Sequence, residues 1–162
     1  TAPWALSVMA QGGTAVLPLP PRGPHPEFIL PTATLSIWPY TDLGDPRWTL
    51  GERFILLNQD PKNDRPQKIG IFAPDGWAAY ANHHSIFIKQ IPIQFEGEYP
   101  DLGVNFEIFT NDAMLELESL GPIEAIPPKG QIDHQEHWTL IEGVPAPKSD
   151  QDVLQHILPH LA

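Results

Sequence analysis

The chain has 162 residues, 41% of them hydrophobic, with 20 prolines, 12 glycines and five tryptophans, which suits one folded domain and excludes a disordered chain. Nine Lys and Arg against 20 Asp and Glu give a formal charge of -11, which disfavours nucleic acid or an anionic membrane surface as a partner because both require a cationic patch. The absence of cysteine excludes disulfides, thiol nucleophiles and thiolate metal sites; no apolar run approaches transmembrane length, and the cellular compartment stays unknown.

Short stretches with a period of two, separated by Pro and Gly, predict many β-strands and no long helix. In the first part of the chain the predicted strands cover residues 4–9, 14–18, 34–38, 53–57, 68–72, 77–82 and 85–90. Gly12-Gly13 and Pro74-Asp75-Gly76 are turn sequences, so we expect one hairpin from the first two strands and another joining 68–72 to 77–82.

The clearest alternation runs from Tyr99 to Leu140 and predicts a three-stranded meander. Its strands cover residues 106–110, 115–119 and 132–141. Turn sequences separate them at Asn111-Asp112 and at Gly121-Pro122.

After Gly143 the pattern changes to helical spacing, with apolar residues at Val153, Leu154, Ile157, Leu158 and Leu161. Ser149 followed by Asp152 resembles a capping box. We therefore predict an all-β fold, an antiparallel β-sandwich over residues 1–145, followed by a tail over residues 146–162 that carries a short helix.

Several motifs occur in an order that resembles a known family. They are Ala2-Pro3-Trp4-Ala5-Leu6, Trp38-Pro39-Tyr40, Asp45-Pro46-Arg47, Lys68-Ile69-Gly70, Trp77-Ala78-Ala79-Tyr80, Tyr99-Pro100-Asp101, Asn105-Phe106-Glu107, Leu115-Glu116-Leu117-Glu118 and the set His134, Glu136 and Trp138. Together they resemble the C-terminal part of uncharacterised proteins in the galactose mutarotase-like superfamily. The resemblance implies a supersandwich with a carbohydrate-facing groove, and it implies no particular reaction.

Members of that family carry a comparable stretch upstream, so the resemblance also implies that this chain corresponds to the C-terminal half of a larger sandwich. Half a sandwich leaves unpaired strand edges, which are prone to association. We expect a homodimer to cover them. The alternative is a chain that packs adequately alone.

Glutamates of the meander are the sharpest candidates for chemistry. A carboxylate that faces a sugar can accept hydroxyl hydrogen bonds, and one with a raised pKa can move protons. We select Glu107 and Glu118 as catalytic candidates and Glu136 as a binding candidate. The alternative is that these strands carry Glu on a solvated face, which is the interpretation we favour for Glu116.

Histidines offer a second kind of site. His83 is a candidate acid, although Asn82-His83-His84 matches the histidine motifs of established aldose epimerases only superficially. His134 and Glu136 lie two residues apart, a spacing that can bring two ligands to one metal ion. Histidines near turns are usually solvated, so we assign no metal ligand and no cofactor. A metal-dependent enzyme that uses a His/Glu site remains an alternative.

The scarce cations and some aromatics complete the predicted site. Arg47 could clamp a sugar acid or phosphate, or form an internal ion pair with Asp42 or Asp45. Lys68 is a further binding candidate. Trp38 and Trp48, beside polar loops, could each present a flat face to a pyranose ring. Tyr99 and Asp101 could shape a groove wall, or form only a turn.

These observations predict a carbohydrate-active protein that binds a saccharide or acts on it by carboxylate acid–base chemistry. The reaction would be of the aldose epimerase or glycoside-processing kind. A noncatalytic sugar-binding or assembly module is the alternative from another class.

Overall fold

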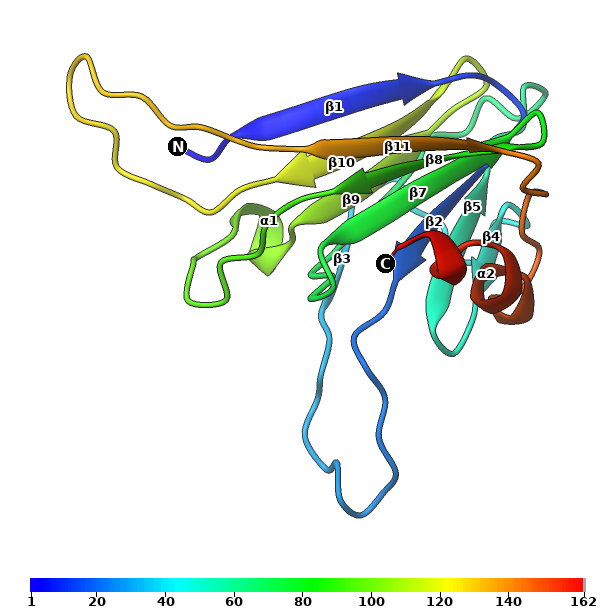
Figure 1. Ribbon diagram of the computed structural model, residues 1–162, viewed down its shortest axis with the longest axis horizontal. Helices are drawn as coiled ribbons and strands as arrows, with labels where there is room; N and C mark the ends of the chain where they lie inside the picture. Colours follow the sequence, from blue (N-terminus) through cyan, green and yellow to red (C-terminus); the bar gives the residue numbers. More distant parts are fainter. Residues whose placement is uncertain (162) are drawn as a thin grey trace.

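Two antiparallel sheets stacked face to face form the body of the protein in the computed structural model, which describes residues 1–161 (Figure 1). Sheet A has the strand order β1 (Trp4–Met9), β10 (Leu115–Leu120), β9 (Phe106–Thr110), β6 (Gln67–Ile71) and β3 (Leu35–Ile37). Sheet B has the order β11 (His137–Glu142), β8 (Ser85–Gln90), β7 (Trp77–Asn82), β2 (Thr14–Pro18), β5 (Phe54–Asn58) and β4 (Trp48–Leu50). The predicted all-β sandwich is confirmed.

Alternation along the strands separates a core between the sheets from a second core outside sheet B. Sheet A sends Ile69, Phe106 and Leu117 inward, where they meet inward-facing residues of sheet B such as Leu17 and Leu57. Neighbouring residues on sheet B point to its opposite face because successive side chains alternate. That outer face of sheet B is also apolar, so it requires a cover.

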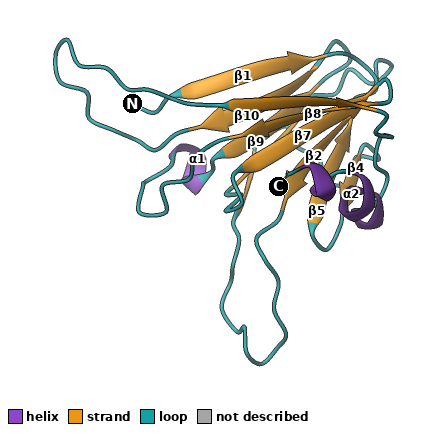
Figure 2. Cartoon of the chain, viewed as in Figure 1, coloured by secondary structure: helices purple, strands orange, loops and turns teal. Residues whose placement is uncertain are grey.

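The C-terminal segment supplies this cover, with α2 (Asp150–His156) and the single 3-10 turn η1 (Leu158–His160). Val153 and Ile157 pack against Val16, Leu56 and other apolar residues of sheet B. The Ser149 hydroxyl caps α2 by accepting a hydrogen bond from the backbone N–H of Asp152. The predicted short C-terminal helix is therefore confirmed, and Figure 2 shows how little of the chain is helical.

Both predicted early hairpins are wrong, because the connections cross between the sheets. β1 pairs with β10 in sheet A, whereas β2 lies between β5 and β7 in sheet B. All five residues of β2 are buried, which suits a central strand, while β1 alternates between exposed and half-buried residues, which suits an edge. The turn at Pro74-Asp75-Gly76 similarly carries the chain from β6 in sheet A to β7 in sheet B.

The predicted meander is correct for its first two strands and wrong for the third. β9 and β10 form a hairpin with Glu107 directly opposite Glu118. β11 begins at His137, later than predicted, and pairs with β8 in sheet B. Residues 121–136 connect sheet A to sheet B, and they form no strand.

Long loops leave the sandwich at two places, after β2 and after β10 (Figure 1). The loop over residues 19–34 carries exposed apolar side chains at Phe28, Ile29 and Leu30. The edge strands are β1 and β3 in sheet A and β11 and β4 in sheet B; the predicted homodimer across such edges stays a prediction. None of the helices in residues 1–161 has the length and apolar character needed to cross a membrane.

Candidate functional site

An ion triad lies on the outer face of sheet A, where three strands bring Glu107, Glu118 and Lys68 together. The Lys68 Nζ is 2.7 Å from Glu107 Oε2. It also lies 2.9 Å from both oxygens of Glu118, of which Oε2 has hydrogen-bond geometry. Two carboxylates directly opposite each other on neighbouring strands repel, so the shared ammonium is what allows this pairing.

The triad is buried although it belongs to the outer face of the sheet. The side chains of Glu107 and Glu118 are 2% and 0% exposed. Two indoles flank the ammonium, with ring centroids 4.8 Å (Trp38) and 5.7 Å (Trp4) from Lys68 Nζ. The Trp4 Nε1 also donates a 2.8 Å hydrogen bond to Glu118 Oε2, which fixes that ring over the carboxylates.

A glycine gives Glu107 its room. Gly70 is the β6 residue that pairs with Glu107. A Cβ at Gly70 would lie 3.2 Å from Glu107 Cγ and 3.1 Å from both methyl groups of Val104. These contacts are tighter than normal packing, so a side chain at position 70 would force Val104 or Glu107 to shift by a few tenths of an ångström.

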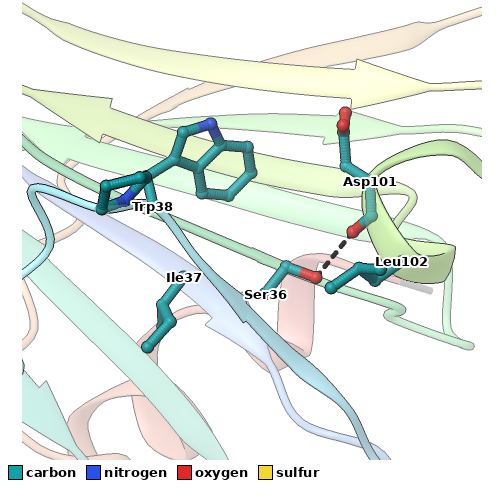
Figure 3. A pocket seen from close by; sticks show the side chains of 6 residues that line it. Ser36, Ile37, Trp38, Asp101 and Leu102 are labelled. Atoms are coloured by element: carbon teal, nitrogen blue, oxygen red, sulfur yellow. Dashed lines mark hydrogen bonds between the residues drawn. The ribbon is translucent and has the colours of Figure 1, made fainter.

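A cleft of about 270 Å³ opens over the triad. Its lining residues come from β1, β6, β9, β10 and the segments after β3 and before β9: Ala2, Trp4, Trp38, Lys68, Pro100, Asp101, Glu107 and Leu120. A second depression of about 210 Å³ is also lined by Trp38 and Asp101 (Figure 3). The two depressions therefore share a wall, and together they form one concave surface.

The wall that carries Asp101 is a left-handed turn. In the segment labelled α1 (Pro100–Gly103), Asp101, Leu102 and Gly103 have φ values of 51°, 71° and 94°. Left-handed backbone costs roughly 1–2 kcal/mol for each residue with a Cβ. The Ser36 hydroxyl holds the turn by donating a 2.6 Å hydrogen bond to the Asp101 carbonyl (Figure 3), and this contact places the Asp101 side chain at the cleft.

Glu107 is the titrating member of the cluster. Burial raises its pKa to about 7, the charge of Glu118 and a hydrogen bond to the Asp101 side chain also raise it, and the Lys68 ammonium opposes them. Burial lowers the pKa of Lys68, but its bonds to Glu107 and Glu118 outweigh burial and raise that pKa. Lys68 therefore stays charged, and Glu107 exchanges its proton close to neutral pH.

One oxygen of this carboxyl group has no partner. Glu107 Oε2 faces Lys68, whereas Oε1 is buried and makes no hydrogen bond to any residue of the described chain. A buried acceptor left without a donor costs about 1–3 kcal/mol. Because Glu107 lines the cleft, a ligand there is the natural source of the missing donor.

Glu136 belongs to a different network, in the interior of the sandwich. Its Oε1 lies 2.9 Å from the fully buried Lys89 Nζ, and it accepts hydrogen bonds from the Ser119 hydroxyl and from Trp138 Nε1. The Ser119 Oγ is also 2.8 Å from His134 Nε2. Burial lowers the pKa of Lys89. Burial alone would raise the pKa of Glu136, but its hydrogen bonds with Lys89 and Ser119 outweigh burial and lower that pKa.

This network ties the segment before β11 to both sheets, because Lys89 also donates a 3.1 Å hydrogen bond to the Leu117 carbonyl on β10. Glu136 does not line the cleft over Glu107. The sequence left two interpretations of His134 and Glu136, a pair of metal ligands or solvated side chains. In the structure both side chains instead form hydrogen bonds with Ser119. Within residues 1–161, no group of three or more His, Asp or Glu side chains is arranged to hold a metal ion.

Arg47 forms an internal ion pair with Asp45, which was one of the two roles that the sequence suggested for this residue. Its Nε and Nη2 each lie 2.9 Å from an oxygen of Asp45, and its remaining donors reach the carbonyls of Asn63 and Arg65. Arg47 and Asp45 are both buried, and Arg47 does not line the cleft. Its guanidinium therefore has no free edge for a sugar acid or a phosphate.

Trp48 and Tyr99 are buried rather than available to a ligand. Trp48 is 8% exposed, belongs to the core between the sheets, and donates a 3.1 Å hydrogen bond to Gln67. Tyr99 packs edge-on against Phe72 and its hydroxyl accepts a hydrogen bond from the Gln94 N–H. Tyr99 thus supports the turn that carries Asp101, and Trp48 stabilises the sandwich.

His83 lies at the tip of the β7–β8 hairpin. It and His84 are exposed and have φ values of 49° and 58°, as a two-residue hairpin turn with both central residues left-handed requires. His83 does not line the cleft. Of the predicted site residues, the structure brings together Glu107, Glu118, Lys68, Trp38 and Asp101, and it places the other five elsewhere.

The main residue that sequence reasoning missed is Trp4. Its strand was predicted, but the ring was not selected because aromatics of a sandwich usually belong to the core. The missing signal was the exposed face of an edge strand: Trp4 is 60% exposed, and Leu6 and Val8 on the same face are exposed too. Neighbouring strands could not be assigned from the sequence, so this face could not be recognised.

Comparisons with protein-family models, with curated proteins and with solved structures found no match to this chain.

Proposed function

We propose that this protein binds a saccharide in the cleft on the outer face of sheet A and that Glu107 exchanges a proton with it. The observation that carries the proposal is the buried Glu107 carboxyl group, with one oxygen unpartnered, at the wall of a cleft lined by two indoles. Indole faces provide broad apolar contact area, which suits the C–H faces of a pyranose ring. The motif resemblance to the galactose mutarotase-like superfamily points to the same class of ligand.

Acid–base catalysis works best when the pKa of the catalytic group lies near the operating pH. The pKa of Glu107 is about 7, so both its protonated and its ionised form are present near neutral pH. Opening a cyclic sugar requires a base that takes the anomeric hydroxyl proton and an acid that protonates the ring oxygen as the bond from C1 to that oxygen breaks. Glu107 suits one of these two roles, and Asp101, which lines the same cleft, is the candidate for the other.

Hydrolysis of a glycosidic bond fits this geometry less well. It needs two carboxyl groups on opposite sides of the scissile bond, roughly 5–9.5 Å apart. Glu107 and Glu118 instead approach one Lys68 ammonium from two sides, and Glu118 is fully buried. A proton transfer of the aldose epimerase kind is therefore the reaction we favour.

The test combines titration calorimetry against a panel of neutral monosaccharides with the mutarotation rate of a freshly dissolved α-anomer, followed by polarimetry. We expect binding by the parent, loss of at least tenfold in affinity for Trp38→Ala, and retained binding with lost rate acceleration for Glu107→Gln. The control is Glu96→Gln, which changes an exposed loop carboxylate.

Binding without any rate acceleration by the parent would overturn the catalytic role and favour the noncatalytic binding module. Absence of binding to every sugar, or binding that Trp38→Ala leaves unchanged, would overturn the assignment of the cleft.

A further inference from the structure

The cleft contains a hydrogen-bond acceptor without a donor, and it carries more negative charge than the neighbouring basic side chains neutralise. Lys68 is the single cation in contact with the cluster in residues 1–161, and it is shared between Glu107 and Glu118. Asp101 lines the same cleft and has no basic side chain within ion-pair distance in the described chain. Glu116, two residues from Glu118 on the same face of β10, is half-buried and likewise lacks such a partner.

The unpartnered oxygen of Glu107 shows where the excess is concentrated. Glu107 Oε1 is buried without a donor, and the Asp101 carboxyl group, which lines the same cleft, is within hydrogen-bond contact of Glu107. Two carboxyl groups that touch each other at the wall of one cleft, with no basic side chain bridging them, favour a ligand that brings positive charge and several N–H donors. Charge-assisted hydrogen bonds of this type are roughly twice as strong as neutral ones.

We propose that the ligand of this cleft is a saccharide with a free amino group, whose ammonium bridges the adjacent Glu107 and Asp101 carboxyl groups from the cleft while its ring contacts the indole of Trp38. This inference rests on the proposed function, because it names the class of saccharide that the same cleft takes. Lys68 does not oppose the ligand charge, since its own charge is already neutralised by the two glutamates of the triad.

The same balance of charge disfavours acidic sugars. A uronic acid or a sugar phosphate would bring a further anion to a surface that already holds Asp101, Glu116 and the triad. The one arginine that the sequence offered for such a ligand, Arg47, is held by Asp45 inside its loop. An N-acetylated sugar keeps the ring but loses the cation, so it isolates the contribution of charge.

The test compares four methyl glycosides by titration calorimetry: those of glucosamine, N-acetylglucosamine, glucose and glucuronic acid. Methyl glycosides are used because they cannot mutarotate, so only binding is measured. We expect the glucosamine derivative to bind at least tenfold more tightly than the glucose derivative, to weaken with added salt, and the glucuronic acid derivative to bind most weakly. Ethanolamine, an amine without a sugar ring, should bind far more weakly than the amino sugar.

Two variants locate the effect. Glu107→Gln and Asp101→Asn should each reduce the preference for the amino sugar over glucose by at least threefold while glucose binding changes little. Glu96→Gln, the exposed control, should leave the preference unchanged. Circular dichroism of each variant, compared with the parent, identifies any that fail to fold.

If the glucose or N-acetylglucosamine derivative binds as tightly as the amino sugar, the inference fails and the proposed function stands. If ethanolamine binds as tightly as the amino sugar, the site takes cations regardless of a sugar ring, and the inference also fails. If none of the saccharides binds, both the inference and the proposed function fail.

Discussion

Replacing Glu107 by Gln should change how the stability of the protein depends on pH. The pKa of Glu107 rises from 4.5 to about 7 in the folded state, first because of burial. A carboxyl group with a raised folded-state pKa holds its proton more tightly in the folded than in the unfolded chain. Its contribution to the free energy of unfolding is therefore largest below about pH 4.5 and is lost as the pH rises through about 7.

The size of this effect follows from the shift. Each pKa unit corresponds to about 1.4 kcal/mol, so moving from 4.5 to about 7 makes the parent lose about 3 kcal/mol of unfolding free energy across this range. Glu107→Gln keeps the shape of the side chain and removes the titration. The variant should thus gain about 3 kcal/mol relative to the parent between about pH 4.5 and about pH 8, whatever its stability at the acidic end.

Urea denaturation followed by tryptophan fluorescence, repeated across this pH range, measures the difference between the two proteins. Titrating groups that do not interact with Glu107 are common to both proteins and cancel in the subtraction. Glu96→Gln should track the parent at every pH, because this side chain is exposed. Parallel stability curves for the parent and Glu107→Gln would falsify the assignment of Glu107 as a buried group that titrates near neutral pH.

Three further changes test interactions that stabilise the fold. Arg47→Ala leaves the Asp45 carboxylate buried without its partner, and we expect a loss of about 3–5 kcal/mol in urea denaturation with unchanged saccharide affinity in the folded protein; a loss below about 1 kcal/mol would contradict the pairing. Ser149→Ala removes the hydroxyl that caps α2, which should cost about 1 kcal/mol, and Ser149→Thr should restore most of it. Leu102→Asn places a residue that tolerates left-handed backbone at φ 71° without losing burial, since Leu102 is exposed; it should stabilise the protein by roughly 0.5–1 kcal/mol, and a loss of stability would contradict the strain.

Alternation in the sequence was sufficient to predict most strands and their faces. Glu116 and Glu118 alternate with Leu115 and Leu117, and the structure places the leucines in the core and the glutamates on the other face of β10. Helical spacing after Gly143 likewise predicted α2, because its apolar residues recur on one side of the helix. These are local properties, and a period of two or 3.6 can be read without knowing the neighbours.

Pairing between strands could not be read in the same way. Gly12-Gly13 and Pro74-Asp75-Gly76 are good turn sequences, but a turn sequence does not state whether the chain returns beside the same strand or crosses to the facing sheet. The informative signal in the sequence was composition: β2 is apolar at nearly every position, as expected of a strand that is covered on both faces. Such a strand belongs at the centre of a sheet, away from the half-exposed β1.

The candidate site shows the same limit at the level of single residues. Glu107 and Glu118 were selected, but nothing in their strands predicted that they would be buried. Their burial depends on Trp4 of β1, on Trp38 directly after β3 at the opposite edge of sheet A, and on the turn at Asp101. The binding role predicted for Trp48 was drawn from the polar loop before it, whereas this residue begins β4 and lies in the core.

Glu116 and Glu118 show what the cover does, because they share a strand and a face and differ by two positions. Glu118 lies under the Trp4 ring and against Lys68, and its carboxylate is fully buried. Glu116 lies beyond this cover, half-buried and without a cation within ion-pair distance in the described chain. The chemical character of the face therefore depends on which residues the two indoles and the left-handed turn shield from water. Opening this cover, for example by Trp4→Ala, would expose the triad, weaken its electrostatic coupling, and move the pKa of Glu107 back towards that of an ordinary carboxyl group.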